Sequence, residues 1–405
     1  MEFHFRNVND AFRTLVGVFH TGEYTTVDGH GTYTTPLKRG PSRYGEVLAI
    51  EGPVLVTYTH PTERVLLNTA RAVNPFFHLY EALWMLAGRN DVAPLVYYNS
   101  RMQEFSDDGV VLNGTAYGYR WRHAWTLRRD MLRDGGGEVE AWLTSSKTPQ
   151  VDQLGLLIDH LKAQPGSRRA VLEMWNVEDD LLGVNESKDV CCNLSVMFSL
   201  RQQSTSKRWD CRAGEPDNDL SGRLKTNLVL DMTVVSRSED LVWGLLGTDY
   251  VDFTFLQEYV AARLGAGVGL YCHFVNNLHV YTSNWRPDEW LADDAGQGGA
   301  ETIEQVYCRP GMRTVPLVSD PTVFESELLR FVELHSSAYR SRTLNSWCEP
   351  FLHDVAHPLL MAFHRRKDSL AVVDNQLRQV ADDGWRLAAT TWLKRRRAKT
   401  DAPTA

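Results

Sequence analysis

Four strand-like runs in the middle of the chain constrain its fold more than any other feature. They are rich in apolar and β-branched residues, which is typical of strands. The runs are AVLEMW (170–175), LSVMFSLR (194–201), LVLDMTVV (228–235) and GLYCHFVNNLHVYT (269–282). Apolar residues at helical spacing predict helices, and these cover residues 8–20, 65–88, 151–163 and 253–265. A chain that mixes strands and helices in this way predicts an α+β fold.

The pattern divides the chain into a catalytic domain over residues 1–318 and a helical C-terminal extension over residues 319–405. Residues 202–226 are polar, and they are expected to form an exposed hairpin inserted between two strands. Residues 292–304 have the composition of a linker, and residues 320–398 carry an almost continuous helical pattern.

Charge and cysteine usage exclude several classes of function. The net charge of −8 argues against a nucleic-acid polymer as partner, because phosphate binding needs a positive face, although a single nucleotide fits. The basic run LKRRRAKT (393–400) is more typical of a solvated helix end than of a docking site; a dimer contact or a lid stays open. The six cysteines lack metal-binding spacing, which predicts free thiols, a reducing compartment and no metal ion.

Neither a targeting segment nor a membrane span is expected. The first residues, MEFHFRNVNDAFRTL, lack the basic and apolar regions of a signal peptide. No apolar run approaches the length of about 18 residues that a membrane span needs. The sequence therefore predicts a cytoplasmic protein, in the host cytoplasm for a viral source, with no membrane partner.

Five polar features have no evident structural purpose at their positions. They are the pair Arg168-Arg169 after Ser167, Cys192 at a strand start, the cluster Arg237-Ser238-Glu239-Asp240, His279 with Tyr281, and Glu81 in an apolar helical run. Taken singly, a cysteine at a strand start is usually a small core residue, and arginine pairs are usually solvated. Glu81 is harder to explain, because a buried charge is costly unless it has a partner or a task.

The order of six motifs resembles that of the thymidylate synthase family. The motifs are FHLYEALWMLAG (77–88), NGTAYGYRWRHAW (113–125), GSRRAVLEMWN (166–176), DVCCNLSVMF (189–198), SRSEDLVWG (236–244) and NNLHVYTSNW (276–285). The resemblance covers roughly residues 8–290. It implies a mixed, mostly antiparallel sheet with helices on one face, in a homodimer that shares arginines across its interface.

The resemblance implies covalent catalysis on a pyrimidine nucleoside monophosphate. Cys192 fits the family's nucleophile better than Cys191, which falls where synthases usually have proline. The thiolate attacks carbon 6, and carbon 5 then takes a one-carbon unit from 5,10-methylenetetrahydrofolate. Nearby guanidinium groups are expected to lower the pKa of the thiol. Glu81 resembles the glutamate that organises water and relays protons, and Tyr117 resembles a residue that assists proton removal from carbon 5.

Arginines are expected to bind the nucleotide phosphate. Arg237, next to Ser238, resembles the arginine donated within the subunit. Arg168 and Arg169 resemble the pair donated by the partner subunit, and Arg43 resembles the remaining one. Arginine suits this task because its planar fork can bind two phosphate oxygens.

Further residues resemble those that contact the sugar and the folate. His279 and Tyr281 resemble the residues that hydrogen-bond the sugar hydroxyl. Asp240 resembles the aspartate that contacts the pterin of the folate, and Trp84 and Phe105 are placed with it in the folate site.

The base and the final step distinguish members of the family. Synthases read uracil with an Asn after the Arg-Ser-x-Asp motif, whereas Asp249-Tyr250 in this region resembles phage dCMP hydroxymethylases. A carboxyl group suits the amino group and bare ring nitrogen of cytosine. The match requires a one-residue insertion; Asp252 is a second candidate, and Asp249 could instead cap a helix. Asn193 and Met197 replace a synthase His and Gln, and this favours water as the final reactant.

The leading hypothesis is therefore a dCMP (or CMP) 5-hydroxymethyltransferase. The alternative within the same chemistry is a thymidylate synthase or a dUMP hydroxymethylase. A third hypothesis is a non-catalytic relative that acts as a scaffold.

Overall fold

A mixed six-stranded sheet forms the centre of the protein. A computed structural model describes residues 1–25, 32–126, 150–182, 187–203, 227–296, 307, 311–337 and 346–401. In spatial order the sheet contains β1 (Glu2–Phe5), β6 (Val54–Tyr58), β13 (Gly267–Val275), β11 (Leu228–Ser236), β10 (Asn193–Gln202) and β9 (Val171–Glu173). The pairs β1–β6 and β13–β11 are parallel, and the other three are antiparallel. This confirms the predicted mixed, mostly antiparallel sheet.

Smaller sheets lie beside the main one. A four-stranded sheet has the order β12 (Glu239–Asp240), β14 (Leu278–Tyr281), β5 (Gly45–Ile50) and β4 (Leu37–Ser42). Two two-stranded sheets pair β2 (Glu23–Thr25) with β3 (Thr32–Thr34), and β7 (Trp125–Thr126) with β8 (Gln150–Val151).

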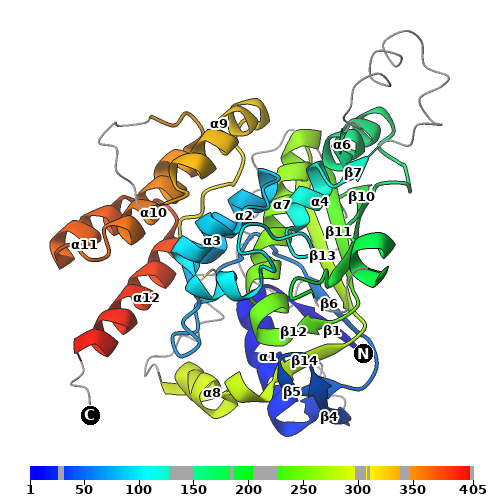
Figure 1. Ribbon diagram of the computed structural model, residues 1–405, viewed down its shortest axis with the longest axis vertical. Coiled ribbons are helices and arrows are strands. Elements are labelled where there is room, and N and C mark those ends of the chain that lie inside the picture. The colour runs from blue at the N-terminus through cyan, green and yellow to red at the C-terminus, as the bar shows by residue number, and fades with distance from the viewer. Residues whose placement is uncertain are drawn as a thin grey trace.

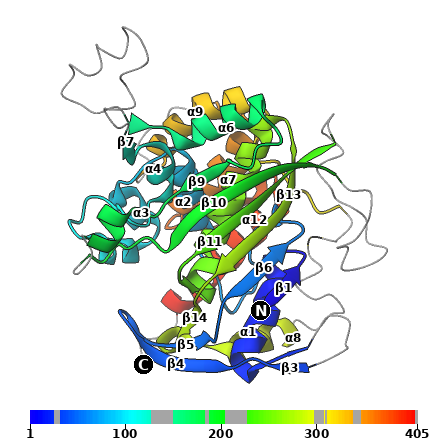
Figure 2. The same ribbon diagram turned by 90° about the vertical axis from the view of Figure 1, so that its right-hand side faces the viewer.

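Helices cover one face of the main sheet, as Figure 2 shows. This layer contains α2 (Pro75–Leu86), α3 (Val92–Tyr98), α4 (Tyr117–Arg122), α6 (Gln153–Ala163) and α7 (Thr248–Leu264). The pair α1 (Val8–Thr21) and α8 (Pro287–Gly296) lies near the smaller sheet. Short helical turns are η1 (Ser100–Glu104), η3 (Glu178–Leu182), η5 (Leu241–Leu245), η6 (Thr282–Asn284) and η8 (Leu352–Ala356). The apolar core fills the space between sheet and helices.

The C-terminal helices pack on the outside of α2 and α7. They are α9 (Pro321–Leu334), α10 (His357–His364), α11 (Leu370–Gln379) and α12 (Asp383–Asp401). The hydroxyl of Tyr80 donates to the carbonyl of Val332 at 3.0 Å. Phe255 of α7 contacts Phe351 and Trp385, with ring centres 5.8 and 6.3 Å apart. These helices therefore share one apolar core with the helices that cover the sheet.

Two of the predicted elements differ from the structure. The helix expected over residues 65–88 begins only at Pro75, because Asn74 caps it by accepting from the amide of Phe77, and proline suits the first helical position. The single strand expected over 269–282 is divided at Asn276–Asn277 into β13 and β14, which belong to different sheets.

The predicted insertion begins and ends on paired strands. The amide of Gln203 donates to the carbonyl of Asn227 at 2.6 Å. The rest of the expected hairpin, residues 204–226, lies outside the described residues. Among the helices that the structure describes, none has the length and apolar character that crossing a bilayer requires.

Candidate active site

Cys192 and Arg237 meet at one end of the central strands. Cys192 immediately precedes β10, and Arg237 immediately follows β11. The backbone amide of Arg237 donates to the carbonyl of Cys192 at 3.0 Å. Its Nη2 lies 3.8 Å from the Cys192 sulfur, and its Nε donates to the carbonyl of Cys191 at 2.8 Å. A cation that can bind an anionic substrate is thus held directly against the candidate nucleophile.

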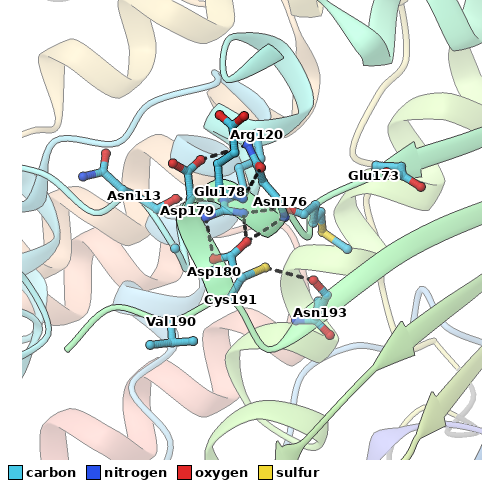
Figure 3. Close-up of polar contacts among 12 residues, drawn as sticks. Asn113, Arg120, Glu173, Asn176, Glu178, Asp179, Asp180, Val190, Cys191 and Asn193 are labelled. Carbon is cyan, nitrogen blue, oxygen red and sulfur yellow. Dashed lines mark hydrogen bonds and ion pairs between the residues drawn. The ribbon is translucent and has the colours of Figure 1, made fainter. Parts of the chain in front are cut away.

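The two adjacent cysteines have different surroundings. Cys191 is fully buried, and its thiol donates to the carbonyl of Asn193 at 2.9 Å. Figure 3 shows it beside the buried ion pair between Arg120 and Asp180. Cys192 is half-buried and faces Arg237 instead. The geometry therefore supports Cys192, rather than Cys191, as the thiol that can reach a substrate.

Burial, rather than the arginine, dominates the acidity of the Cys192 thiol. Burial and the charge of Glu239 raise its pKa to about 12, and the positive charge of Arg237 opposes them only in part. The expectation of a lowered pKa was therefore wrong for the protein without substrate. The thiol needs a proton acceptor before it can attack.

A buried hydrogen-bond network connects the nucleophile to the start of α7. Asn193, the residue after Cys192, donates from Nδ2 to the carboxylate of Asp249 at 2.7 Å. The hydroxyl of Ser236 donates to Asn193 Oδ1 and lies 2.6 Å from His273 Nε2. Asn193 is fully buried at the end of β10. Asn193, which stands where synthases commonly have a histidine, thus hydrogen-bonds Asp249, whose carboxyl group is expected to contact the base.

Asp249 does not serve as a helix cap. It lies within α7, whose N-cap is Gly247, and the cap makes no side-chain hydrogen bond. Burial raises the pKa of Asp249 to about 6, although the hydrogen bonds from Asn193 and Thr248 oppose this. Near neutral pH the group therefore exchanges between a carboxylate that only accepts hydrogen bonds and an acid that also donates one.

Three further buried carboxyl groups surround Asp249. Glu81, Asp252 and Glu239 are 5%, 2% and 5% exposed, and burial raises the pKa of each well above its usual range. One carboxyl oxygen of each is buried without a hydrogen-bond partner. Within the described residues, no group of His, Cys, Asp or Glu is arranged to hold a metal ion. These groups are therefore available to hold or move protons.

Glu239 had been given no role by the sequence. Its charge acts on Cys192 more strongly than that of any other residue, and Asp249 is the strongest charge acting on it in turn. A Cβ atom at Gly244 would lie 1.6 Å from its Oε1, so only glycine leaves room for this carboxyl. Its position in the Arg-Ser-Glu-Asp motif was the sequence signal that could have identified Glu239 as a site residue.

Tyr117 lies in the same cluster. It is buried on α4, with its ring 5.9 Å from that of Phe253. Burial raises the pKa of Tyr117 well above its usual range, and the charges of Asp249 and Cys192 add to this. Its phenol therefore stays neutral at physiological pH and can donate a hydrogen bond.

The predicted sugar-binding residues form one wall of the site. His279 and Tyr281 lie on β14 with ring centres 5.3 Å apart, and Ser238 Oγ is 3.4 Å from His279 Nδ1. Tyr44 connects this wall to Phe105, because its ring centre is 6.4 Å from Tyr281 and 6.0 Å from Phe105. Phe105 thus lies nearer the predicted sugar wall than the sequence indicated.

Other predicted residues are Arg43, the pair Arg168-Arg169 and Trp84. Arg43, at the β4–β5 turn, donates to the carbonyl of Ser187 in the segment that leads to Cys192. Arg168 and Arg169 are exposed before β9. Trp84 is fully buried, and its indole N–H donates to Asp91 Oδ1 at 3.2 Å.

Asp240 lies at the start of η5. Its Oδ1 accepts hydrogen bonds from the amides of Val242 and Trp243, at 2.9 and 2.5 Å. Burial raises the pKa of Asp240, while these bonds and the positive charges of His279 and Arg71 oppose the shift. Arg71, a residue that the sequence did not single out, therefore belongs to this side of the site.

A thiol beside a guanidinium, ringed by buried carboxyl groups, is an arrangement that can attack an anionic substrate through a cysteine. The thymidylate synthase family model matches residues 45–297. A deoxyuridylate hydroxymethyltransferase of Pseudomonas phage M6 is 34% identical over 377 residues, which cover 90% of this chain and 89% of that protein. A protein of the same name from Bacillus phage SP01 is 34% identical over 270 residues, which cover 65% and 57%. A thymidylate synthase of Symbiobacterium thermophilum is 26% identical over 224 residues, covering 54% and 61%.

The chain therefore belongs to the thymidylate synthase family, as a one-carbon transferase that acts at carbon 5 of a pyrimidine nucleotide.

Proposed function

We propose that this enzyme transfers a hydroxymethyl group to carbon 5 of deoxyuridylate, with Cys192 as the covalent nucleophile. The observation that supports this chemistry is the position of the Cys192 sulfur, which lies 3.8 Å from the Arg237 guanidinium and close to buried carboxyl groups. The deoxyuridylate substrate and the hydroxymethyl product are supported by the names of the two phage relatives. The second candidate is dCMP (or CMP), which is favoured by Asp249 in place of an asparagine.

The side chains have distinct tasks in this reaction. The Cys192 sulfur forms a bond to carbon 6 as its proton passes to an ionised carboxylate of the surrounding cluster. Carbon 5 becomes nucleophilic and takes the one-carbon unit of 5,10-methylenetetrahydrofolate; loss of the carbon 5 proton, assisted by Tyr117, and of tetrahydrofolate leaves an exocyclic methylene group on the base. Water held by Glu81 adds to this methylene group, and the bond between Cys192 and carbon 6 then breaks to release the hydroxymethyl product and the thiolate.

The base contacts Asp249 in its neutral form. A neutral carboxyl can donate one hydrogen bond and accept another. Toward uracil, it donates to the carbonyl oxygen on carbon 4 and accepts from the ring N–H. Toward cytosine, it donates to the bare ring nitrogen and accepts from the amino group. Since Asp249 fits both bases, the proposal of uracil is supported by the names of the two phage relatives.

Phosphate and folate bind on opposite sides of this centre. Arg237 binds the phosphate from within the subunit, together with Arg43 at the turn beside Ser187. Asp240 and the buried guanidinium of Arg71 fit a folate pterin, because they offer an acceptor and a donor at the start of η5. The phage relatives support the host cytoplasm as the place of reaction.

The proposal is tested by tritium release from the 5-tritiated forms of dUMP, dCMP, UMP and CMP, with methylenetetrahydrofolate. We expect release from dUMP, a hydroxymethyl product and no dihydrofolate. Release from a cytosine nucleotide alone would replace the substrate by the second candidate. Formation of dihydrofolate together with dTMP would identify a synthase, and release from none of the four would indicate a non-catalytic scaffold.

A homodimer is proposed because Arg168 and Arg169 are exposed in the single chain, on the sheet edge that starts at β9. The open face of the main sheet in Figure 2 is the surface through which two copies pack. In this arrangement each subunit donates the arginine pair to its neighbour's phosphate site.

Mixing two inactive variants is expected to restore activity. Arg168→Ala protein lacks the donated arginine, and Cys192→Ala protein lacks the nucleophile. After random exchange, half of the dimers are mixed and each has one intact site, which gives roughly a quarter of the wild-type rate. Tritium release measured before and after subunit exchange checks this. If mixing gives no gain although mass spectrometry detects mixed dimers, the site is not shared.

A further inference from the structure

The loop over residues 68–74 has a conformation that must be held by its surroundings. Asn68 accepts from the amide of Arg71 at 2.7 Å through its side chain and from the amide of Ala72 at 3.0 Å through its carbonyl. Its Nδ2 donates to the carbonyl of Trp290 at 3.0 Å. Ala72 has a φ of 45°, a left-handed backbone that an L side chain rarely adopts. Such a conformation persists only where neighbouring structure stabilises it.

The C-terminal helix provides a contact to this loop. Arg395 of α12 donates from Nη1 to the carbonyls of Thr69 and Ala70, the latter at 2.7 Å. Its Nη2 lies 3.6 Å from Glu289 Oε1 of α8. The helix α12, red in Figure 1, also packs against α2, which follows the loop. One guanidinium thus connects the loop to two helices that are distant from it in sequence.

The loop places Arg71 on the Asp240 side of the site. Arg71 Nη2 donates to the carbonyl of Val242 at 3.2 Å. Burial lowers the pKa of Arg71, and the charge of Asp240 partly restores it. Its Nε is buried without a hydrogen-bond partner. A buried donor without an acceptor is costly, so this nitrogen fits a ligand that supplies one.

We propose that Arg395 is a positioning residue for folate binding: through the carbonyls of Thr69 and Ala70, the C-terminal helix fixes the loop that presents Arg71 beside Asp240. This inference rests on the proposed function, since it takes the Asp240 side as the folate side. It also gives the basic run of the C-terminal helix a task, because the run's Arg395 is directed to the loop.

Arg395→Ala is expected to raise the KM for methylenetetrahydrofolate about tenfold, while the KM for the nucleotide changes less than twofold. Arg395→Lys should restore most of the folate affinity, because an ammonium can also donate to two carbonyls. The control is Lys394→Gln, which removes one charge from the adjacent, exposed position of the same run. Melting temperatures of all variants show whether any of them is unfolded.

A double variant distinguishes an effect that passes through the loop from a general loss of structure. If Arg395 acts through Arg71, Arg71→Ala raises the folate KM, and adding Arg395→Ala has little further effect. An unchanged folate KM, or an equal rise in both KM values that lysine does not rescue, would overturn the inference alone. A wild-type protein that neither binds nor consumes folate would overturn the proposed function, and the inference with it.

Discussion

Cys192→Ser is expected to lower tritium release from the 5-tritiated nucleotide by about 10⁴-fold or more, the order found when a covalent nucleophile is removed. A serine hydroxyl is a much weaker nucleophile than a thiol, and Arg237 cannot ionise it. The measurement is single-turnover release with saturating nucleotide and methylenetetrahydrofolate, which reports the carbon 5 chemistry rather than product release.

Cys191→Ser is the matched control for this experiment. Its thiol is buried and donates to the carbonyl of Asn193, a bond that a hydroxyl can make as well. We expect the control to keep its activity within about tenfold, the range of a modest packing change. If Cys191→Ser is the inactive variant and Cys192→Ser is active, the assignment of the nucleophile is wrong.

Asp249→Asn is expected to remove the pH dependence of nucleotide capture. With a pKa of about 6, the neutral form of Asp249 falls to about one hundredth at pH 8. If the neutral form reads the base, kcat/KM for the nucleotide decreases as pH rises through 6, since this parameter reports the free enzyme. An amide donates and accepts at every pH, so the variant has a flat profile and exceeds the wild type at pH 8 with dUMP.

The Asp249→Asn variant also distinguishes uracil from cytosine as the base of the substrate. In this variant the amide that donates to the carbonyl of uracil must rotate to fit cytosine, and it can rotate only if it breaks its hydrogen bond with Asn193. We therefore expect the rate with dCMP to fall by about 10²-fold or more. Asp252→Asn, one turn further along α7 and 2% exposed, makes the same carboxyl-to-amide substitution and should keep the descending profile. A wild-type kcat/KM that rises through pH 6 would show that the ionised carboxylate reads the base.

The elements with strong local signals could be predicted from the sequence. The strands β10 and β11 and the end of α7 at Gly265 agree with their apolar patterns and with the left-handed cap. The start of α2 could not be placed from periodicity, because residues 65–68 and 73 are buried by tertiary contacts and mimic a helical pattern. A cap at Asn74 followed by Pro75 was the better signal.

The proximity of two candidate site residues could be predicted from the sequence, but their chemical environment could not. Motif order brought Cys192 and Arg237 together, yet the raised pKa of the thiol depends on burial and on Glu239, which no local pattern shows. Met197, used as an argument for the final step, is 40% exposed on β10 between buried Val196 and Phe198. It therefore faces the open side of the sheet, so an effect of Met197 on the final step would require the second subunit of the proposed dimer.

The helix α2 links catalysis to the C-terminal helices mechanically. All twelve of its residues are buried, with Glu81 directed to the carboxyl cluster and Tyr80 bonded to α9. The proposed boundary near residue 318 marks a change in composition, whereas the apolar core continues across it. In this chain the C-terminal helices therefore cannot be removed without exposing to solvent the helix that carries Glu81.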